Sequence, residues 1–389
     1  MNTKTNTTQS KILKTVGNKK ITRKDLAKIV NLTPASITKI VNNLIEKKII
    51  TETGEQVPTR KAGRKKSLIR LNKDYGYIFG IAIETNCITI ALANLYKETI
   101  ASISKSIEKP LVIEVIDYIS ESIEKIISTN NISKQRILGV GVSIVGIVDS
   151  TTGFSVHAFG IWNHQVGITD LLEERLGLRV ILDNNVRALA LAEIEAQDYS
   201  NDLLFIKYGP RIGSSLIIKN EIYSGNSSQA LEFGHIIVDK EGLQCSCGQQ
   251  GCLETVGSFV SIKRNIKKRF NESDILQKLC DQNISNLDQN KIIEAFDLED
   301  SIVVEEIKYA IKYFSVALFN LMKILDTKIV VLYGPFFEND KIFRLLTTQI
   351  DETGKTLIER IKRSAISNDK SIGAISLARI KFFYNINNK

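Results

Sequence analysis

This sequence has no long apolar segments, and its cysteines and first residues lead us to expect neither a disulfide framework nor a secretory leader. No apolar run approaches the roughly 18 residues that a helix needs to cross a bilayer, so we expect no contact with a membrane. Residues 1–10 contain no apolar segment of the kind found in secretory signals. The five cysteines are an odd number, and three of them fall between residues 245 and 252. Disulfides are therefore not expected, and the pattern predicts a reduced, cytoplasmic setting.

Charge is distributed unevenly over the 389 residues. Hydrophobic residues make up 43% and charged residues 24%, which is typical of a globular protein with two or three domains. Residues 1–73 contain 18 Lys and Arg against 4 Asp and Glu, a net charge of +14, whereas residues 74–389 carry −5. This asymmetry indicates an anionic partner for the first part of the chain.

The basic segment has the pattern of a helix-turn-helix. Residues 11–16 predict a short helix, and Thr22 has the residue type to cap a second helix over residues 23–30. After a turn, the pair Thr33–Pro34 has the residue types of an N-cap and a first helical position. The helix that follows, about 34–47, has one apolar and one polar face. The polar face offers the candidate DNA contacts Ser36, Lys39, Asn42 and Asn43.

A basic hairpin follows the third helix. Residues 49–53 and 67–71 predict two strands, and the segment between them is rich in Lys and Arg. Such a hairpin is typical of the wing of a winged helix-turn-helix, whose cations contact phosphates or a minor groove. The alternative is a small helical bundle with a solvated charged face, but the order of elements and the charge favour double-stranded DNA as the partner. The candidate wing contacts are Arg60, Lys61, Arg64 and Lys65.

From residue 75 the pattern changes to that of a mixed α/β protein. Three strands come first and then strands and helices alternate, which indicates a mixed sheet. A second series of the same kind begins at residue 203, so the element pattern repeats although the sequence does not. We expect two α/β lobes around a cleft, where small ligands tend to bind. Strands are expected at residues 77–83, 88–94, 99–104, 137–144, 179–182, 203–208, 214–218, 221–223 and 328–333, and helices at 113–128, 169–176, 186–196 and 301–325.

A group of metal-binding residue types is concentrated in the second lobe. His235 is followed by Cys245, Cys247 and Cys252. One imidazole and three thiolates form a closed tetrahedral set of soft ligands, which predicts structural zinc. The alternative is a chance cluster of free cysteines, which the small number of cysteines and histidines in the chain argues against.

Two short motifs in this region carry a resemblance to a known family. Residues 232–235 read Glu-Phe-Gly-His, and residues 245–254 read Cys-Ser-Cys-Gly-Gln-Gln-Gly-Cys-Leu-Glu. They closely resemble the two signatures of the ROK family, which contains repressors and sugar kinases, and the resemblance spans essentially residues 75–389. It implies a two-lobed, actin-like ATPase fold with a sugar in the cleft. The winged head resembles the repressor branch of the family.

The expected domain boundaries follow from this resemblance. We expect a winged helix-turn-helix over residues 1–73 and a sugar-binding domain over residues 74–389. Within the second domain, lobe 1 would span about 74–197 together with a C-terminal helix, and lobe 2 would span about 198–364.

The resemblance also implies which residues contact the sugar. By motif, these are Asn184, Asn185, Glu232, His235 and Glu254. His235 would serve zinc and sugar together, with one ring nitrogen on the metal and the other against a hydroxyl.

Three departures from the kinase motifs of the family predict that the chain is not an enzyme. Asn185 stands where the kinases carry the aspartate that takes the proton from the sugar hydroxyl, and an amide cannot act as a base near neutral pH. Glu84 occupies the first phosphate loop, where its charge would repel a phosphate. Pro210 removes a backbone N–H donor from the second phosphate loop.

Together these features predict a sugar-responsive transcriptional repressor that leaves its operator when a monosaccharide binds. The effector would be a sugar of the xylose, glucose or N-acetylglucosamine type. A homodimer or tetramer is expected, because paired half-sites require paired heads. Two alternatives stay open: an active ROK sugar kinase with a DNA-binding head, and a switch in which sugar or a partner protein tightens DNA binding.

Overall fold

The computed structural model describes residues 2–17, 19–57, 66–197, 202–226 and 230–384. The chain divides into two compact units, each of which is described by itself. Unit 1 contains residues 1–196 and 369–389, and unit 2 contains residues 197–368. Among the described residues, none of the helices combines the length and the apolar character needed to cross a bilayer.

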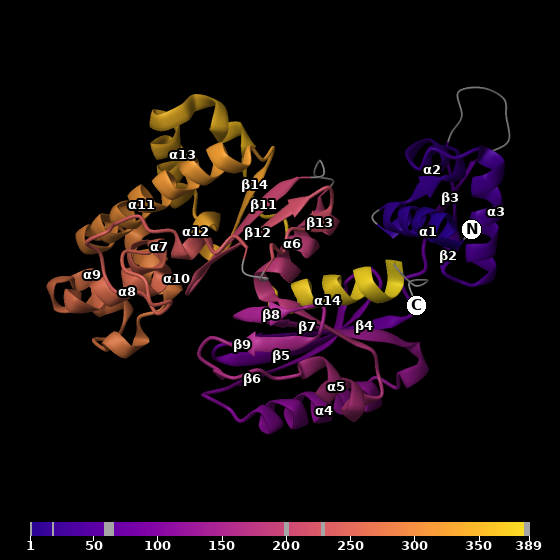
Figure 1. Cartoon of the computed structure of the whole chain (residues 1–389), viewed down its shortest axis with the longest axis horizontal. Coiled ribbons are helices and arrows are strands. Elements are labelled where there is room, and N and C mark those ends of the chain that lie inside the picture. The colour runs from indigo at the N-terminus through magenta and orange to yellow at the C-terminus, as the bar shows by residue number, and fades with distance from the viewer. Residues whose placement is uncertain (1, 18, 58–65, 198–201, 227–229, 385–389) are drawn as a thin grey trace. The chain divides into compact units, whose positions relative to one another are not determined.

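The head of unit 1 is a winged helix-turn-helix, as the sequence predicts (Figure 1). Its elements are α1 (Asn2–Gly17), β1 (Ile21–Thr22), α2 (Arg23–Ile29), α3 (Pro34–Glu46), β2 (Ile50–Val57) and β3 (Lys66–Leu71), and its strands pair in the order β1-β3-β2. Thr22 Oγ1 accepts a hydrogen bond from the Asp25 N–H (3.1 Å), and Thr33 Oγ1 accepts one from the Ser36 N–H (3.2 Å). Both helices therefore begin at the expected caps. Helix α1 begins earlier than the sequence predicts. Its first turns are polar and show no apolar period, so the sequence pattern gives no sign of them.

The rest of unit 1 is built on a five-stranded sheet. Its strands are β4 (Tyr77–Glu84), β5 (Cys87–Asn94), β6 (Thr99–Ser106), β7 (Ile137–Ile144) and β10 (Val180–Asn184), in the order β10-β7-β4-β5-β6. Helices α4 (Val112–Thr129) and α5 (Ile168–Leu176) cover one face, and α6 (Asn185–Ala196) and α14 (Ile372–Ala378) cover the other (Figure 1). The smaller elements are η1 (Lys134–Arg136), the hairpin of β8 (Ile147–Asp149) and β9 (Phe154–His157), and the π-helical turn η6 (Arg379–Tyr384).

Unit 2 is built on a second five-stranded sheet. Its strands are β11 (Leu203–Tyr208), β12 (Ile212–Ile218), β13 (Glu221–Ile222), β14 (Val330–Tyr333) and β15 (Ile361–Arg363), in the order β13-β12-β11-β14-β15. The helices are α7 (Leu253–Gly257), α8 (Phe259–Lys268), α9 (Asp274–Leu279), α10 (Gln289–Asp297), α11 (Ser301–Leu325), α12 (Pro335–Glu338) and α13 (Asp340–Gly354). The short helical turns are η2 (Phe233–His235), η3 (Phe270–Glu272), η4 (Ile284–Asn286) and η5 (Lys355–Arg360).

The two sheets follow the same plan. In each, three consecutive strands pair antiparallel, and two later strands extend the sheet in parallel beyond the first strand. Two copies of one arrangement of strands are therefore present without a visible sequence repeat. This is the repetition of elements that the hydrophobic pattern predicts, and the mixed α/β fold class is confirmed.

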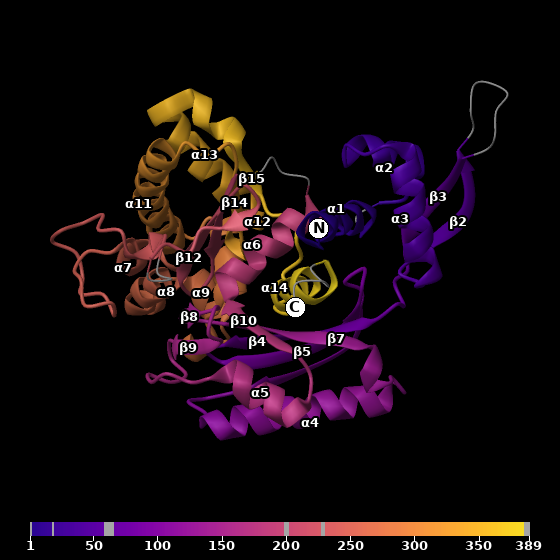
Figure 2. The ribbon, with the colours of Figure 1, turned by 45° about the vertical axis from the view of Figure 1, so that its right-hand side comes forward.

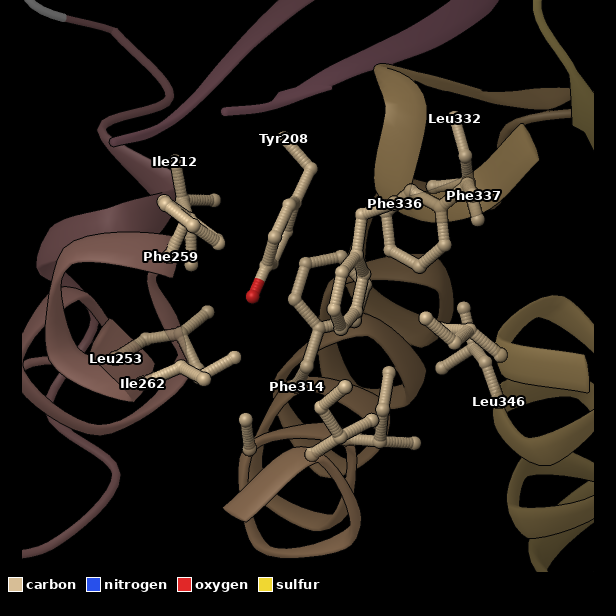
Figure 3. Close-up of a cluster of buried hydrophobic side chains, with 14 of the residues drawn as sticks. Tyr208, Ile212, Leu253, Phe259, Ile262, Phe314, Leu332, Phe336, Phe337 and Leu346 are labelled. Atoms are coloured by element: carbon tan, nitrogen blue, oxygen red, sulfur yellow. The ribbon is translucent and has the colours of Figure 1, made fainter. Parts of the chain in front are cut away.

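The core of unit 2 contains a group of packed aromatic rings (Figure 3). Tyr208, at the end of β11, stacks on Phe336 with ring centroids 4.4 Å apart and meets Phe314 and Phe337 at steep angles. Its hydroxyl donates a hydrogen bond to the carbonyl of the last residue of α7 (2.6 Å). The buried hydroxyl is thus paired. This packing fixes the point where the chain enters the loop at residues 209–211.

Three glycines let the C-terminal segment lie directly on the sheet of unit 1. Gly80 lies on β4, and Gly139 and Gly141 lie on β7. A Cβ atom at any of them would overlap atoms of α14 or η6, and at Gly141 the overlap is with the backbone carbonyl of Ala374. The absence of side chains at these positions is therefore what allows the close approach of the helix.

Candidate functional site

The exposed face of α3 presents the four residues expected to contact DNA. The opposite face of the helix contributes three aliphatic side chains to the core of the head. The exposed residues are Ser36, Lys39, Asn42 and Asn43. The four predicted wing contacts, Arg60, Lys61, Arg64 and Lys65, lie outside the described residues.

Arg23, which the sequence analysis does not single out, ties the elements of the head together. It is the first residue of α2, and its Nη2 donates to Asn42 Oδ1 on α3 (3.3 Å). Its Nη1 lies 2.8 Å from Glu52 Oε1 on β2. One guanidinium therefore links α2, α3 and β2 and orients the Asn42 amide. No local pattern signals this contact, because the partners are distant in sequence.

Four soft ligand groups meet in unit 2. The ligand atoms of His235, Cys245, Cys247 and Cys252 all lie within 4.8 Å of one another. Cys245 Sγ is 3.5 Å from His235 Nδ1, and Cys247 Sγ is 3.6 Å from Cys252 Sγ. Tetrahedral zinc with bonds of about 2.3 Å to sulfur and about 2.0–2.1 Å to nitrogen separates its ligand atoms by about 3.6–3.8 Å. The arrangement can hold a metal ion of this kind.

The backbone of the cluster explains how residues distant in sequence converge. His235 ends the turn η2, and Cys252 immediately precedes α7. Gly248 and Gly251 adopt φ values of 92° and 76°, which side chains rarely tolerate. A Cβ atom at Gly251 would also overlap the carbonyl oxygen of Asp239. These two glycines therefore allow the ligand loop to fold back on itself.

Burial and contacts with neighbouring groups shift the pKa values of three of the cluster residues. Burial and hydrogen bonds with the neighbouring thiols raise the pKa of Cys252 to about 12. Burial acts in the same direction on Cys247, but hydrogen bonds from the Gln249 backbone and the other thiols outweigh it and lower the pKa of Cys247. Burial and then the charge of Arg211 lower the pKa of His235, which favours neutral imidazole, the form that binds metals. A bound cation would allow all three thiols to ionise.

Two carboxylates lie beside the cluster. Glu254 is 9% exposed, and its Oε2 accepts a hydrogen bond from the Ile212 N–H (2.9 Å). Burial raises the pKa of Glu254 to about 7, the Ile212 N–H opposes this rise, and the charge of Glu232 adds to it. A Cβ atom at Gly234 would lie 3.0 Å from Glu254 Oε2. Because that position is glycine, Glu232 and His235 come together with Glu254 in one region of unit 2.

Asn184 and Asn185 lie in unit 1, where β10 meets α6. Oδ1 of Asn184 accepts hydrogen bonds from the N–H groups of Val186 (2.8 Å) and Arg187 (3.3 Å), so Asn184 caps α6. Its Nδ2 donates to the carbonyl of Gly146 (2.7 Å). An amide nitrogen carries two hydrogens, so the second hydrogen can be given to a ligand.

Asn185 pairs with Glu84, the last residue of β4. The Asn185 side chain is buried, and its Nδ2 donates to Glu84 Oε1 (3.1 Å). An aspartate at position 185 would place a second anion against Glu84 and raise the pKa of one of the two carboxyls. Asn185 and Glu84, which the family resemblance implies are two separate departures from the kinase motifs, are therefore joined by one hydrogen bond.

Comparison with known proteins identifies the body and the head separately. A sequence model described as “ROK family” matches residues 78–381. The chain belongs to the ROK family. A second model, described as “Winged helix-turn-helix DNA-binding”, matches residues 5–51. The family resemblance inferred from the two short motifs is thereby confirmed.

The relatives of this ROK protein include a repressor and a kinase. The chain is 27% identical over 329 residues to the xylose repressor of Caldicellulosiruptor bescii. The aligned region covers 82% of this chain and 81% of the repressor. The chain is 29% identical over 249 residues to the glucokinase of Halalkalibacterium halodurans, and this aligned region covers 63% of this chain and 71% of the glucokinase. The crystal structure of a ROK family transcriptional regulator, a homolog of the Escherichia coli MLC protein, has the same fold. Its TM-score is 0.80 at 22% identity, and the match covers 98% of this chain and 97% of that one.

Proposed function

We propose that this ROK protein is a DNA-binding transcriptional repressor that a monosaccharide releases from its operator. The observation that carries the proposal is the presence in one chain of a winged helix-turn-helix with an exposed polar α3 and of a ROK body. Similarity to a protein named xylose repressor supports it. Residues 1–73 would bind DNA and residues 74–389 would bind the sugar, with lobes at about 74–197 plus the C-terminal helix and at about 198–364.

The sugar would be bound by the polar side chains that the family motifs assign to it. Asn184 can donate its second amide hydrogen to a hydroxyl, and Asn185 lies beside it. Glu232 would accept hydrogen bonds, and Glu254, with a pKa of about 7, can accept or donate near neutral pH. His235 would meet a hydroxyl with the ring nitrogen that the metal does not use. Sugars of the xylose, glucose and N-acetylglucosamine types are all rich in hydroxyls that suit this set.

Zinc is the metal that fits the cluster best. Three sulfur ligands and one imidazole nitrogen match its preferences, and the spacing of the ligand atoms suits a tetrahedral ion. When bound, zinc would cross-link η2 to the segment that leads into α7. Four protein ligands leave no open position, so the metal would be structural. By fixing His235, it would also orient one wall of the sugar site.

The same geometry favours a sensor over an enzyme. The Asn185 amide cannot remove a proton from a sugar hydroxyl, and it is already bonded to Glu84. In the first phosphate loop that the family resemblance implies, the negative charge of Glu84 would oppose a nucleotide phosphate. An active sugar kinase with a DNA-binding head is the second candidate, and the similarity to a glucokinase supports it.

We expect Glu232→Gln to weaken sugar binding about tenfold or more, because hydrogen bonds to a charged group contribute about 1.5–3 kcal/mol. The measurement is the shift in unfolding temperature with D-xylose, D-glucose and N-acetyl-D-glucosamine, followed by calorimetry with the best of the three. Glu221→Gln, which removes an exposed carboxylate of β13, should bind as the wild type does. The same sugars with ATP should give only background phosphate transfer. Turnover that disappears in Glu232→Gln would establish the kinase instead.

We expect Lys39→Ala to weaken DNA binding and to reduce its dependence on salt. Each lost phosphate contact changes the slope of log K against log salt by about 0.9. The probe is the duplex that the sugar-free protein selects from a random-sequence pool, titrated at several salt concentrations. Lys14→Ala, on the exposed side of α1, is the control and should leave the slope unchanged. An unchanged slope in Lys39→Ala would remove this lysine from the interface.

The operator would be double-stranded DNA with paired half-sites, and the protein would bind it as a homodimer or tetramer. Its place of action would be the cytoplasm, with no membrane partner. Sedimentation of the free protein and of its DNA complex would give the number of subunits bound.

A further inference from the structure

We propose that helix α6 couples the sugar contact Asn184 to the DNA-binding head through a buried charged cluster that ends on α1. This cluster, the junction cluster, consists of Lys97, Glu195, Arg379 and Tyr384. The proposal rests on the proposed role of Asn184 in sugar binding. All of these residues belong to unit 1. Together they form a continuous path of contacts from the ligand side of the unit to the head.

The path begins where Asn184 holds the first turn of α6. Its Oδ1 accepts two backbone hydrogen bonds of that turn, and its Nδ2 bonds to the carbonyl of Gly146 in the loop between β7 and β8. The cap and the ligand contact are therefore one side chain. A sugar that draws the Asn184 amide toward itself changes the geometry of the cap and with it the start of α6.

Helix α6 is positioned to carry such a change along its length. Most of its residues are buried, and it packs against α14 (Figure 2). A Cβ atom at Gly373 of α14 would lie 2.9 Å from the backbone nitrogen of Leu189 and 3.0 Å from the carbonyl carbon of Ala188. The two helices thus meet backbone to backbone. Because such an interface is close-packed and resists compression, a shift of α6 has to move α14 or repack it.

The far end of α6 carries Glu195 into the junction cluster. Its carboxylate oxygens lie 3.3 Å from Lys97 Nζ and 3.2 Å from Arg379 Nε. The side chains of Glu195, Lys97 and Arg379 are only 7%, 14% and 2% exposed. Arg379 also donates to the carbonyl of Leu95 (2.9 Å) and to the hydroxyl of Tyr384. Moving Glu195 away would leave buried charges unpaired, which is strongly unfavourable, so the cluster has to follow α6.

The head lies against the other side of this cluster. A Cβ atom at Gly17, the last residue of α1, would be 2.5 Å from Tyr384 Oη and 3.2 Å from Arg379 Nη2. Three aliphatic side chains of α1 share one buried apolar cluster with the aromatic rings of η6 and with the buried face of α3. A displacement of η6 therefore reaches the helix proposed to read DNA through packed side chains.

Stability alone does not account for a cluster of this kind. Apolar side chains of similar volume often stabilise a protein as well as a buried ion pair does. The hydrogen bonds from Lys97 to Glu195 and from Arg379 to Leu95 and Tyr384 are instead directional, so they favour one arrangement of the segments that they join. A sugar that binds more tightly to a second arrangement at Asn184 would shift the equilibrium between the two arrangements of unit 1. The coupling free energy between sugar and DNA can be no larger than the difference in the sugar's binding free energy for these two arrangements.

The test is a thermodynamic cycle on the full chain, comparing wild type with Tyr384→Phe. The probes are the duplex selected by the sugar-free wild type and the sugars D-xylose, D-glucose and N-acetyl-D-glucosamine. Tyr384→Phe removes only the hydroxyl that Arg379 and Gly17 meet. We expect the effective sugar to weaken DNA binding by about tenfold or more in the wild type and by less than about threefold in the variant. In the absence of DNA, the affinity of Tyr384→Phe for the sugar should stay within about twofold of the wild-type affinity.

Two further variants sharpen the test. Tyr223→Phe removes the hydroxyl of an exposed tyrosine in unit 2 and should keep the full coupling. Gly17→Ala leaves the junction cluster chemically intact but adds a carbon where Tyr384 Oη lies. It should lose the coupling as Tyr384→Phe does, so the outcome does not depend on how one variant folds.

The possible failures are distinguishable. Coupling of wild-type size in both Tyr384→Phe and Gly17→Ala would overturn the role of the junction cluster and leave the proposed function intact. A wild-type protein that binds none of the three sugars, or whose DNA binding none of them changes, would overturn the proposed function and the coupling path together. The first failure is seen only in the variants, and the second is already seen in the wild type.

Discussion

Cys247→Ser should release the metal from the protein and lower the free energy of unfolding of unit 2 by several kcal/mol. Cys247 is exposed, so the change from sulfur to oxygen disturbs little packing, and the effect comes from the lost ligand. A serine hydroxyl stays protonated near neutral pH and does not replace a thiolate. In small zinc domains the metal contributes about 10 kcal/mol or more. Unit 2 keeps a large apolar core without the metal, so we expect its free energy of unfolding to fall by less than in those small domains.

Metal content measured by mass spectrometry and unfolding in denaturant check this prediction together. Cys87→Ser is the control. The Cys87 sulfur lies outside the cluster and 2.9 Å from Lys370 Nζ, and a hydroxyl can accept the same hydrogen bond. This variant should keep its metal and its stability. A wild-type metal content in Cys247→Ser would show that the cluster does not bind zinc through this thiol.

Gly141→Ala should destabilise unit 1 by about 3 kcal/mol or more. The added methyl would overlap the carbonyl oxygen of Ala374 and approach the Ala378 Cβ to 3.0 Å. The oxygen belongs to the backbone of α14, so no side-chain rotation relieves the overlap, and the helix itself has to move. Overpacking of a core typically costs about 1–3 kcal/mol and more when the backbone must shift. Chemical unfolding followed by circular dichroism measures the change.

The matched control for this substitution is Gly209→Ala. A Cβ atom there has its nearest neighbour at 4.0 Å, so the methyl group fits without displacement. The same change of residue type should alter stability by about 0.5 kcal/mol or less. Equal effects of the two variants would mean that the packing of α14 on β7 is not close enough to exclude a methyl group.

Local signals are what made much of the fold predictable. Thr22 and the pair Thr33–Pro34 mark helix starts by their own hydrogen-bonding chemistry, and the structure has both caps. The long helix α11 was expected at residues 301–325 and occupies Ser301–Leu325, because its apolar period is sustained over many turns. The short helices α7 to α10 were not expected. Helices α7 and α9 have only five and six residues, too few for a hydrophobic period to stand out, whereas α8 and α10 are at least as long as α5 and carry apolar faces that their sequences do signal.

In the candidate site too, the features close together in sequence were predictable and the contacts between distant segments were not. The ligand set around Cys245 is compact in sequence, so its spacing alone predicted a cluster that the structure brings together. The bond between Asn185 and Glu84 could not be predicted in this way. It joins the end of β4 to the start of α6, and only the pairing of strands brings these two points together. Gly17 and Tyr384 meet for the same reason, since tertiary packing alone relates them.

Unit 1 is completed by two stretches of chain that are made at different times. Residues 369–384 are synthesised after all of unit 2, yet they supply the helix that lies on the glycine-lined strands and the aromatic rings that complete the core of the head. A ribosome that has just passed residue 196 has therefore produced a head whose first helix still lacks the aromatic partners that η6 supplies. A fragment ending at a premature stop codon would expose that surface. Chaperones and proteases would then recognise the fragment before it could occupy an operator without regulation.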